Sequence, residues 1–293
     1  MTDDPLPPQA RAANLQLWNA WTRAHERAPG YDVEGFKAGT RTLTRVELDE
    51  LVPLIHDGTT LLHLQCHFGL DTLCCARLGA RVVGLDFSDQ AIALARRLAD
   101  EVGLGERASF VLSDLYEAGA HLEGRRFDIV FVNWGAIEWL PDLERWAAIV
   151  ARHLAPGGSL VMAEVHPFSY SLDEVPGEQD VFVGYRLLAD PEKPAVDPVD
   201  GTYADPDAHF EGLVAYGWQH NFAEIVGVLT GAGLRVESLR EFPFAPAPSW
   251  PWMEEDDERM FWLPDGHGGR RDDLPFSFTL RATMPVPKEG SGA

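Results

Sequence analysis

An acidic residue at the end of a short apolar run gives the first chemical clue in this sequence. Residues 61–86, LLHLQCHFGLDTLCCARLGARVVGLD, predict an apolar strand, a tight loop, a short helix and a second apolar strand that ends at Asp86. In such a β-loop-α-β unit, the acid at the tip of the second strand accepts hydrogen bonds from the two hydroxyls of a ribose. The plain alternative is that Asp86 caps the helix that begins near Ser88. The pattern favours a nucleoside-binding edge with Asp86 as the sugar ligand.

The loop between the first strand and the first helix helps to decide which nucleoside cofactor fits. It reads Gln65-Cys66-His67-Phe68-Gly69, and only its last position is glycine. A GxGxxG loop that cradles a pyrophosphate needs its glycines, because side chains crowd the phosphates. Nicotinamide and flavin cofactors are therefore disfavoured. Asp114, which follows a third apolar run, could accept a hydrogen bond from an adenine amino group or simply cap the next turn.

The spacing of apolar residues predicts the elements that position these groups. Strands alternate with helices from residue 61 onward, which is typical of an α/β, Rossmann-like, doubly wound and mostly parallel sheet. The predicted strands are 61–65, 81–86, 108–113, 127–133, 159–165, 234–242 and 276–283. The predicted helices are 10–27, 44–55, 70–79, 88–103, 142–154 and 220–232, with a glycine-bearing loop at 29–39.

Other segments frame or interrupt the sheet. Residues 1–9 are polar and proline-rich and are expected to form a disordered tail, followed by an N-terminal helical cap at 10–60. Residues 61–293 form the main domain, with insertions at about 168–217 and 243–274. Long excursions of this kind are usually lids, binding loops or subunit contacts. The first insertion could be a pocket wall or the contact of a homodimer.

Net charge and composition exclude several classes of partner. The 293 residues carry a formal net charge of −22, and the basic residues form isolated pairs rather than a stripe. Nucleic acids are polyanions, so such a surface repels them. No apolar run approaches the roughly 20 residues of a membrane span, and we expect no signal peptide. The three cysteines lack metal-binding spacing and fit a reducing compartment. We expect a cytoplasmic protein that acts on a small molecule, without nucleic acid or membrane.

The order of the motifs resembles a known family. LHLQCHFG, VVGLDFS, VLSDLY, FDIVFVNWG and LAPGGSLVMAE follow one another as in the class I S-adenosylmethionine-dependent methyltransferases. More narrowly, the chain resembles a bacterial branch whose first motif is LHLQCHFGLDTL, with further likeness in YDVEGFKAG, EVHPF, WQH and EFPF. The resemblance covers nearly the whole chain from about Asn14. It implies a seven-stranded sheet with an antiparallel last strand, S-adenosylmethionine as cofactor and S-adenosylhomocysteine as product.

The first motif departs from the (D/E)xGxGxG pattern that is usual in the family. His63 stands at the acid position, and Gln65 and His67 stand at the first two glycines, so only Gly69 matches. The usual acid helps to orient the methionine end of the cofactor, and its loss leaves this task to groups such as the amide of Gln65. We expect an altered but intact cofactor site. Its expected residues are Gln65, Cys66, His67, Phe68, Gly69, Asp86, Phe87, Ser88, Asp114, Leu115, Asn133, Trp134, Trp18 and Phe36.

Methyl transfer by in-line displacement needs alignment and a place for a proton. Trp134, just past the fourth strand, suits a cationic sulfonium, and Asn133 beside it could bind the methionine amine or the substrate. His166 ends the fifth strand, where a general base is expected, and His220 and Tyr31 are further catalytic candidates. For each of these three residues the competing interpretation is a structural role.

The segments around these candidates narrow the chemistry. Trp18, Tyr31 and Phe36 could cover the cofactor from the N-terminal cap, or could equally be ordinary helix docking. The sequence at 133–136, NWGA, is not the (D/N)PP(Y/F/W) box of amino methyltransferases that act on nucleobases. The fourth strand also lacks the terminal acid of metal-dependent catechol-type enzymes, so we expect no essential metal.

Three functions remain. The first is an S-adenosylmethionine-dependent methyltransferase that methylates oxygen or nitrogen of a small molecule. The second is a non-catalytic or regulatory protein that binds the cofactor or its demethylated product, which the unusual first motif favours slightly. The third is a nucleotide-sugar or nicotinamide enzyme on a related fold, which the missing glycines disfavour. Asp86, Asp114 and the aromatic edge of the fourth strand favour the first.

Overall fold

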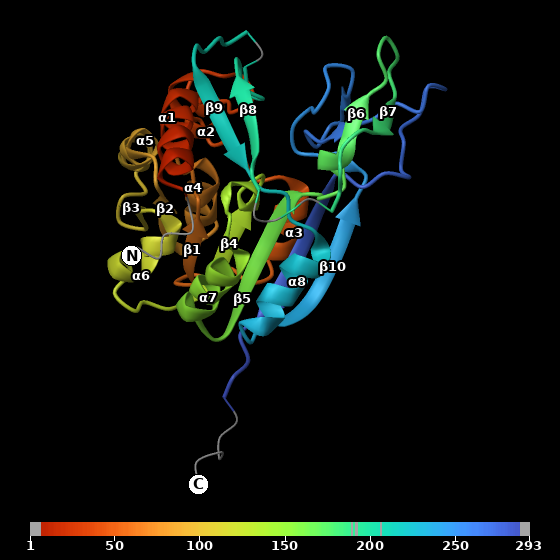
Figure 1. Ribbon diagram of the computed structural model, residues 1–293. Helices are drawn as coiled ribbons and strands as arrows, with labels where there is room; N and C mark the ends of the chain where they lie inside the picture. The colour runs from red at the N-terminus through yellow and green to blue at the C-terminus, as the bar shows by residue number, and fades with distance from the viewer. Residues whose placement is uncertain (1–6, 189, 191–192, 206, 288–293) are drawn as a thin grey trace.

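A seven-stranded sheet runs through the computed structural model, which describes residues 7–188, 190, 193–205 and 207–287 (Figure 1). The strand order is β10-β14-β5-β4-β1-β2-β3, and β14 is antiparallel to both of its neighbours. The strands are β1 (Thr60–Leu64), β2 (Arg81–Asp86), β3 (Ala108–Leu112), β4 (Phe127–Asn133), β5 (Leu154–Val165), β10 (Arg235–Phe242) and β14 (Ser277–Thr283). The predicted Rossmann-like sheet with an antiparallel last strand is confirmed.

Helices cover both faces of this sheet (Figure 1). They are α1 (Pro8–His25), α2 (Val33–Lys37), α3 (Arg45–Leu51), α4 (Leu70–Arg77), α5 (Asp89–Glu101), α6 (Ala118–His121), α7 (Leu143–His153) and α8 (Phe222–Gly231), with the 3₁₀ turns η1 (Leu115–Glu117), η2 (Ile137–Trp139) and η3 (Ser169–Ser171). Successive side chains of a strand point to opposite faces. In β1, Leu62 and Leu64 therefore join the buried cluster with α7 and α8, whereas Leu61 joins the cluster with α3, α4 and α5.

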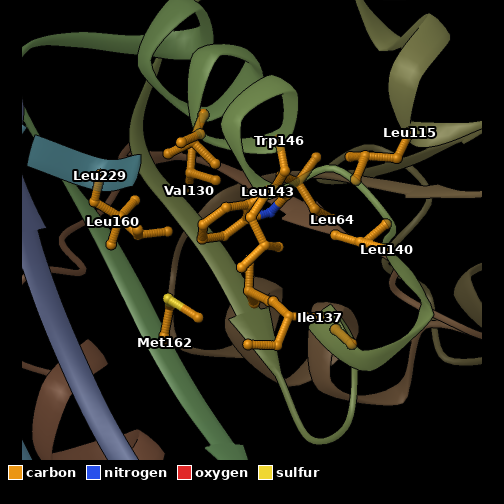
Figure 2. Packing of buried hydrophobic residues seen from close by; sticks show 14 of the residues in the cluster. Leu64, Leu115, Val130, Ile137, Leu140, Leu143, Trp146, Leu160, Met162 and Leu229 are labelled. Carbon is orange, nitrogen blue, oxygen red and sulfur yellow. The ribbon is translucent and has the colours of Figure 1, made fainter. Parts of the chain in front are cut away.

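Trp146 of α7 lies at the centre of the first cluster (Figure 2). Its side chain is fully buried against side chains of β4 and β5, such as Val130 and Met162. Burial of apolar surface stabilises by about 25 cal/mol per Å². The same cluster holds Ile137 and Leu140, which follow β4. The packing of α7 thus fixes the segment that carries η2 at the carboxyl end of the sheet.

The two insertions form small sheets beyond the carboxyl ends of the strands (Figure 1). In the first insertion, β6 (Leu172–Glu174) pairs with β7 (Val181–Val183), and β8 (Ala195–Val199) pairs with β9 (Leu213–Gly217). In the second, β11 (Phe244–Ala245), β12 (Glu254–Glu255) and β13 (Phe261–Trp262) form a three-stranded sheet. Leu172 of β6 shares a buried cluster with Met253 and Leu263 of the second insertion, while β9 packs against α1. The first insertion therefore has two parts, one that packs on the second insertion and one that packs on α1. Its roles as a lid or a dimer contact stay predictions.

The N-terminal region is also divided. α1 begins at Pro8 and packs against α5 and β9, whereas α3 packs against β5 and β14 as part of a sheet-covering layer. Of the residues expected to form a disordered tail, 1–6 lie outside the described residues. The loop expected at 29–39 contains α2, because Asp32 adopts a left-handed conformation and its side chain accepts a hydrogen bond from the backbone N–H of Gly35 at 3.0 Å.

Candidate functional site

The loop after β1 adopts the backbone of a glycine-rich turn with one glycine. Gln65, His67 and Gly69 have φ angles of 54°, 49° and 78°, all in the left-handed region. A non-glycine residue held there costs about 1–3 kcal/mol, and such strain clusters at functional sites. A Cβ atom on Gly69 would lie 2.6 Å from the ring of Phe110, so this position has a steric need for glycine as well. The loop shape is thus kept at an energetic cost.

Asp86 ties this loop to the tip of β2. Its Oδ2 accepts a hydrogen bond from the backbone N–H of His67 at 2.8 Å, and its Oδ1 accepts one from that of Ser88 at 2.9 Å. Burial raises the pKa of Asp86 to about 6, although the backbone hydrogen bonds oppose this shift. Each carboxylate oxygen can accept a further bond. The helix cap is Ser88, whose Oγ accepts from the backbone N–H of Ala91.

Asp86 also lines a narrow cleft of about 40 Å³. A groove of about 600 Å³ shares Phe87, Ser113 and Asp114 with this cleft. Of the expected cofactor residues, those that line the cleft are Gln65, Asp86, Phe87, Asp114 and Leu115. The lining residues that sequence reasoning missed are Arg11, Asn14, Ser113, Tyr116, Leu85, Trp139 and Leu140. The three-residue spacing of Arg11 and Asn14 places them on one helix face, which was the available signal.

Asp114 is engaged with both η1 and α1. Its Oδ1 accepts a hydrogen bond from the backbone N–H of Tyr116 at 2.8 Å and caps η1, as the plain alternative expected. Its Oδ2 forms an ion pair with Nε of Arg11 at 3.0 Å. Asn14, one turn further along α1, exchanges two 2.9 Å hydrogen bonds with the backbone of Tyr216 in β9. These contacts hold α1 across the carboxyl edge of the sheet.

Two buried polar atoms of the cleft have no hydrogen-bond partner among the described residues. Nε2 of Gln65 donates to the carbonyl of Ala136 at 2.7 Å, but Oε1 of Gln65 receives no donor. Nε1 of Trp139 likewise has no acceptor. An unsatisfied buried polar group costs about 1–3 kcal/mol. A ligand with an ammonium and a carboxylate, as in an amino acid, supplies the missing donor and the missing acceptor.

His63 and Asn133 belong to a buried network beneath the loop. Nδ1 of His63 accepts from Oγ1 of Thr72 at 2.7 Å, and its Nε2 donates to Oδ1 of Asn133 at 2.8 Å. Nδ2 of Asn133 donates to Glu47 at 2.7 Å and to Asp71 at 2.8 Å. Burial lowers the pKa of His63 and raises that of Glu47. The amide of Asn133 is thus engaged inside the protein, and its place does not support the expected role in cofactor binding.

Other expected cofactor residues have packing roles. Cys66 and Phe68 are buried in the cluster with α4 and α5, and burial raises the pKa of the Cys66 thiol. Phe36 lies in the same cluster beneath the guanidinium of Arg77, which is 4.0 Å from its ring centroid. Trp134 packs against a cluster formed by Val46, Phe244 and Met260. None of these side chains lines the cleft or the groove described above.

His166 is committed to structural hydrogen bonds. Its Nδ1 accepts from the backbone N–H of Phe168 at 3.0 Å, and its Nε2 donates to Glu241 at 2.8 Å. Burial lowers the pKa of His166, while Glu241 opposes this shift. Because the lone pair faces an amide and the proton faces a carboxylate, this histidine ties β5 to β10. The general-base role expected for it does not fit this geometry.

His220 is engaged in the same way. Its Nε2 donates to the carbonyl of Leu140 at 2.7 Å, and its Nδ1 lies 3.0 Å from Glu224 of α8. The side chain is buried and joins the segment after η2 to α8. These contacts give His220 a structural role in place of the expected catalytic one.

Tyr31 and Trp18 meet over the loop after β1. The ring of Trp18 lies 5.1 Å from that of His67, and the ring of Tyr31 lies 5.7 Å from it, centroid to centroid. Tyr31 also stacks on His25 at 4.9 Å and is hydrogen-bonded to Tyr203 of the first insertion. Burial raises the pKa of Tyr31 well above its ordinary value. Of the three expected catalytic residues, Tyr31 is the one beside the cofactor loop.

The turn after β4 is held by one carboxylate. Oε1 of Glu164 accepts hydrogen bonds from the backbone N–H groups of Ala136 at 2.7 Å and Ile137 at 3.2 Å. Its Oε2 accepts from the N–H groups of Gly135 and Val165. Glu164 is 1% exposed, and burial raises its pKa. The turn that carries Trp139 therefore has a shape fixed by β5.

Two further searches of the described part of the chain bear on the expected partners. No group of three or more His, Cys, Asp or Glu side chains there is placed to hold a metal ion. No helix there has the length and apolar character needed to cross a membrane.

The chain was then compared with known proteins. Residues 62–162, which run from β1 to β5, match the family described as "Methyltransferase domain". The match covers about a third of the chain and includes four segments that line the cleft: the loop after β1, the tip of β2, the segment after β3 and the turn after β4. α1, which also lines the cleft, lies outside the matched residues.

Curated proteins that are similar to part of this chain differ in their named acceptors. A ubiquinone biosynthesis O-methyltransferase of Rhizobium etli is 32% identical over 40% of this chain and 46% of its own length. A 23S rRNA (uracil(1939)-C(5))-methyltransferase of Acidithiobacillus ferrooxidans is 35% identical over 52% of this chain and 33% of its own length. The chain spans about half the length of the first curated relatives that it matches. The names of these relatives point to different chemical classes, ubiquinone biosynthesis in one case and RNA in the other, and therefore indicate no single acceptor class.

Solved structures share the fold over most of the chain. An S-adenosylmethionine-dependent methyltransferase from Listeria monocytogenes has a TM-score of 0.55 and 16% identity, and the match covers 81% of this chain and 97% of that one. The glycopeptide N-methyltransferase MtfA with S-adenosylhomocysteine has a TM-score of 0.52 and 18% identity, with 88% and 99% covered. At these identities the likeness establishes the methyltransferase fold.

Proposed function

We propose that this protein uses S-adenosylmethionine to methylate an oxygen or nitrogen atom of a small molecule. The observation that carries the proposal is the loop after β1. Its left-handed residues, its tie to Asp86 and the orphaned Oε1 of Gln65 together keep a nucleoside-binding shape without the usual glycines. Strain and unsatisfied atoms are retained where a ligand compensates for them.

The residues of the cleft match the parts of such a cofactor. Asp86 has free acceptor capacity for ribose hydroxyls, and Phe87 and Asp114, shared by cleft and groove, suit the face and the amino group of adenine. Oε1 of Gln65 and Nε1 of Trp139 suit an ammonium and a carboxylate. The cleft is too narrow for these groups and has to widen as they enter. We infer that α1 moves, because Arg11 and Asn14 line the cleft.

When bound, S-adenosylmethionine would supply an electrophilic methyl group on a sulfonium. The protein has to orient the acceptor opposite the leaving sulfur, exclude water and hold the departing proton. The aromatic side chains of Trp18 and Tyr31 lie beside the loop after β1 and can shield this region from water.

A small-molecule acceptor fits the charge of the protein. The net charge of −22 opposes the approach of an RNA backbone, and the basic residues do not form a stripe. Acidic surfaces do not hinder a neutral or cationic metabolite in the same way.

The structural roles of His166 and His220 support a second candidate, a protein that binds the cofactor or its product without turnover. Calorimetric titration with S-adenosylmethionine, S-adenosylhomocysteine and NADH tests both candidates. We expect both adenosyl compounds to bind and NADH not to bind; binding of NADH alone would refute the proposal. Release of S-adenosylhomocysteine in the presence of small-molecule acceptors then separates the enzyme from the binding protein.

A further inference from the structure

A buried histidine, His25, and a half-buried one, His67, meet between α1 and the loop after β1. Nδ1 of His25 lies 3.0 Å from Nε2 of His67, within hydrogen-bond distance. Nε2 of His25 is hydrogen-bonded to Oγ1 of Thr202 in the first insertion. His25 is 0% exposed. The contact therefore joins three segments that are far apart in the sequence, and one of them is the cofactor loop.

The chain of hydrogen bonds ends at a nitrogen with no partner. Nδ1 of His67 is buried and has no hydrogen-bond partner among the described residues. His67 is also one of the residues held in the left-handed region, at the position of a glycine in the usual motif. The backbone of His67 is strained and its Nδ1 is buried without a hydrogen-bond partner among the described residues. Both features are typical of a residue that binds a ligand.

The partners of His25 select a proton arrangement for the pair. If Thr202 accepts from Nε2–H of His25, then Nδ1 of His25 is bare and accepts from Nε2–H of His67. Nδ1 of His67 then carries a free lone pair. The reverse arrangement would leave a buried N–H donor without an acceptor on the same atom. Only the first arrangement gives His67 a nitrogen that can take up a proton.

The surroundings keep both rings neutral at rest. Burial lowers the pKa of His25 to about 3, and burial together with His25 lowers that of His67 well below its ordinary value. The titratable groups that pack on the pair are Tyr31 and Tyr203, which stay neutral because burial raises the pKa of both. Trp18 contacts both histidine rings. The two imidazole rings therefore lie among aromatic side chains, and the Asp86 carboxylate contacts the backbone N–H of His67 rather than either ring.

We propose that Nδ1 of His67 accepts the proton of a hydroxyl acceptor during methyl transfer, and that His25 positions His67 and shares the proton. This inference rests on the proposed function. As the bond between the acceptor oxygen and the methyl carbon forms, the sulfur–carbon bond breaks and its electron pair stays on sulfur. The hydroxyl proton moves to Nδ1 of His67, and the proton on Nε2 can shift toward Nδ1 of His25. The positive charge lost from sulfur is thus balanced by one on the histidine pair.

The environment of the pair favours a hydroxyl over an ammonium as the acceptor. An ammonium has to lose its proton before its nitrogen can attack, which a weakly basic imidazole performs poorly. A hydroxyl can attack first, and its proton becomes strongly acidic as the oxygen–carbon bond forms. A weak base is sufficient at that stage and releases the proton readily afterwards. The ring of His67 contacts only aromatic and imidazole rings among the contacts described, and the carboxylate of Asp86 bonds the backbone N–H of His67 rather than its ring.

The first test is the tautomer of His67, measured by nitrogen–proton correlation spectra of ¹⁵N-histidine-labelled protein with S-adenosylhomocysteine. We expect His67 to keep its proton on Nε2 and a bare Nδ1 between about pH 5.5 and 8.5. His25→Leu should release this preference, and His25→Asn should retain it because an amide oxygen can replace Nδ1. A proton on Nδ1 in the wild-type complex overturns the proposal. Failure of S-adenosylhomocysteine to bind would instead refute the proposed function.

The second test measures methyl transfer to phenol, catechol and benzyl alcohol, with aniline and benzylamine as amine counterparts. We expect transfer to hydroxyl members, and His67→Gln should lower kcat by about 100-fold or more while the Kd for S-adenosylhomocysteine changes little. His56→Gln, at an exposed histidine remote from the cleft, is the matched control. Preferential transfer to the amines, or an unchanged kcat in His67→Gln, overturns the assignment.

Discussion

The backbone N–H of His67 and Oδ2 of Asp86 are joined by a 2.8 Å hydrogen bond, so the loop after β1 and the tip of β2 form one unit. A substitution of Asp86 should therefore alter the position of His67, and a displaced His67 should alter that of the Asp86 carboxylate. The expected sugar ligand and the proposed proton acceptor are therefore linked through a single backbone amide.

Replacement of Asp86 by Asn should weaken binding of S-adenosylhomocysteine by about 1–3 kcal/mol, the scale of a lost charge-assisted hydrogen bond. The amide keeps one acceptor oxygen and places its NH2 group against the other of the two backbone N–H groups, those of His67 and Ser88. Isothermal titration calorimetry measures the change. Asp49→Asn, at an exposed position on α3, should bind like the wild type. An unchanged Kd in a folded Asp86→Asn protein would remove Asp86 from the cofactor site.

The pKa of Asp86, raised to about 6 by burial, predicts a pH dependence. Protonation removes acceptor capacity, so affinity for S-adenosylhomocysteine should fall as the pH drops below about 6. The effect on folding has the opposite sign. The folded state holds this proton more tightly than the unfolded state, so the Asp86 contribution to stability declines as pH rises from the ordinary value of 3.8 to about 6. Both slopes should be absent from Asp86→Asn, as calorimetry and urea unfolding at several pH values can show.

Substitution of Gly69 by Ala should cost more stability than the same substitution of Gly103, whose φ is similar. Gly69→Ala adds a Cβ that would meet the Phe110 ring at 2.6 Å, in addition to the cost of a positive φ. In Gly103→Ala the φ is also positive, but nothing lies within 4 Å of the new atom. We expect a loss of about 1 kcal/mol for Gly103→Ala and at least about 2 kcal/mol for Gly69→Ala in urea unfolding. Equal losses would mean that Phe110 can move aside.

His166→Ala should lower stability and leave ligand binding intact. The substitution removes the bonds to Phe168 and Glu241 and opens a cavity beside Phe278, which predicts a loss of about 1–3 kcal/mol in the free energy of unfolding. The Kd for S-adenosylhomocysteine should be that of the wild type. A folded and stable His166→Ala protein with impaired methyl transfer would restore the catalytic role that its place at the end of β5 first indicated.

Glu47→Gln tests the network around Asn133. Burial and the nearby Asp71 raise the pKa of Glu47, so the folded protein keeps this proton above the ordinary value of 4.5. Wild-type stability should therefore decline as pH rises from that value toward the raised pKa. Gln resembles the protonated acid, and the variant should lose this decline and gain on the wild type in alkaline buffer. Parallel stability curves for the two proteins would contradict the raised pKa.

The sequence predicts best what depends on neighbouring residues. The apolar runs predict the seven strands that the sheet contains. The position of Asp86 after VVGL predicts a site at the tip of the second strand, and Asp86 does line the cleft. Residues at the correct strand end were harder to assign, because the role of a side chain depends on its partners. His166 directly follows β5, as expected, but Glu241 and the N–H of Phe168 occupy its two nitrogens.

Contacts between distant segments were beyond the local pattern. Asn133 was expected to face a ligand, but α3 brings Glu47 within 2.7 Å of its amide. His25 reaches Thr202 because β8 and β9 fold back onto α1, which no periodicity in the sequence indicates. The left-handed φ of Gln65 and His67 was also hidden, because only a few per cent of non-glycine residues adopt that conformation.

Backbone N–H groups of the turn after β4 converge on the carboxylate of Glu164, in an arrangement like the nests that bind anions. Here the bound anion is a side chain of the same protein. Because the backbone N–H groups of Gly135, Ala136 and Ile137 already donate to Glu164, they cannot also donate to an incoming phosphate. We therefore expect these amides not to bind a phosphorylated metabolite. The turn after β4 also needs no bound ligand to reach its conformation. We therefore expect the backbone of Gly135, Ala136 and Ile137 to keep its conformation when a ligand binds, and any widening of the cleft to come from other segments.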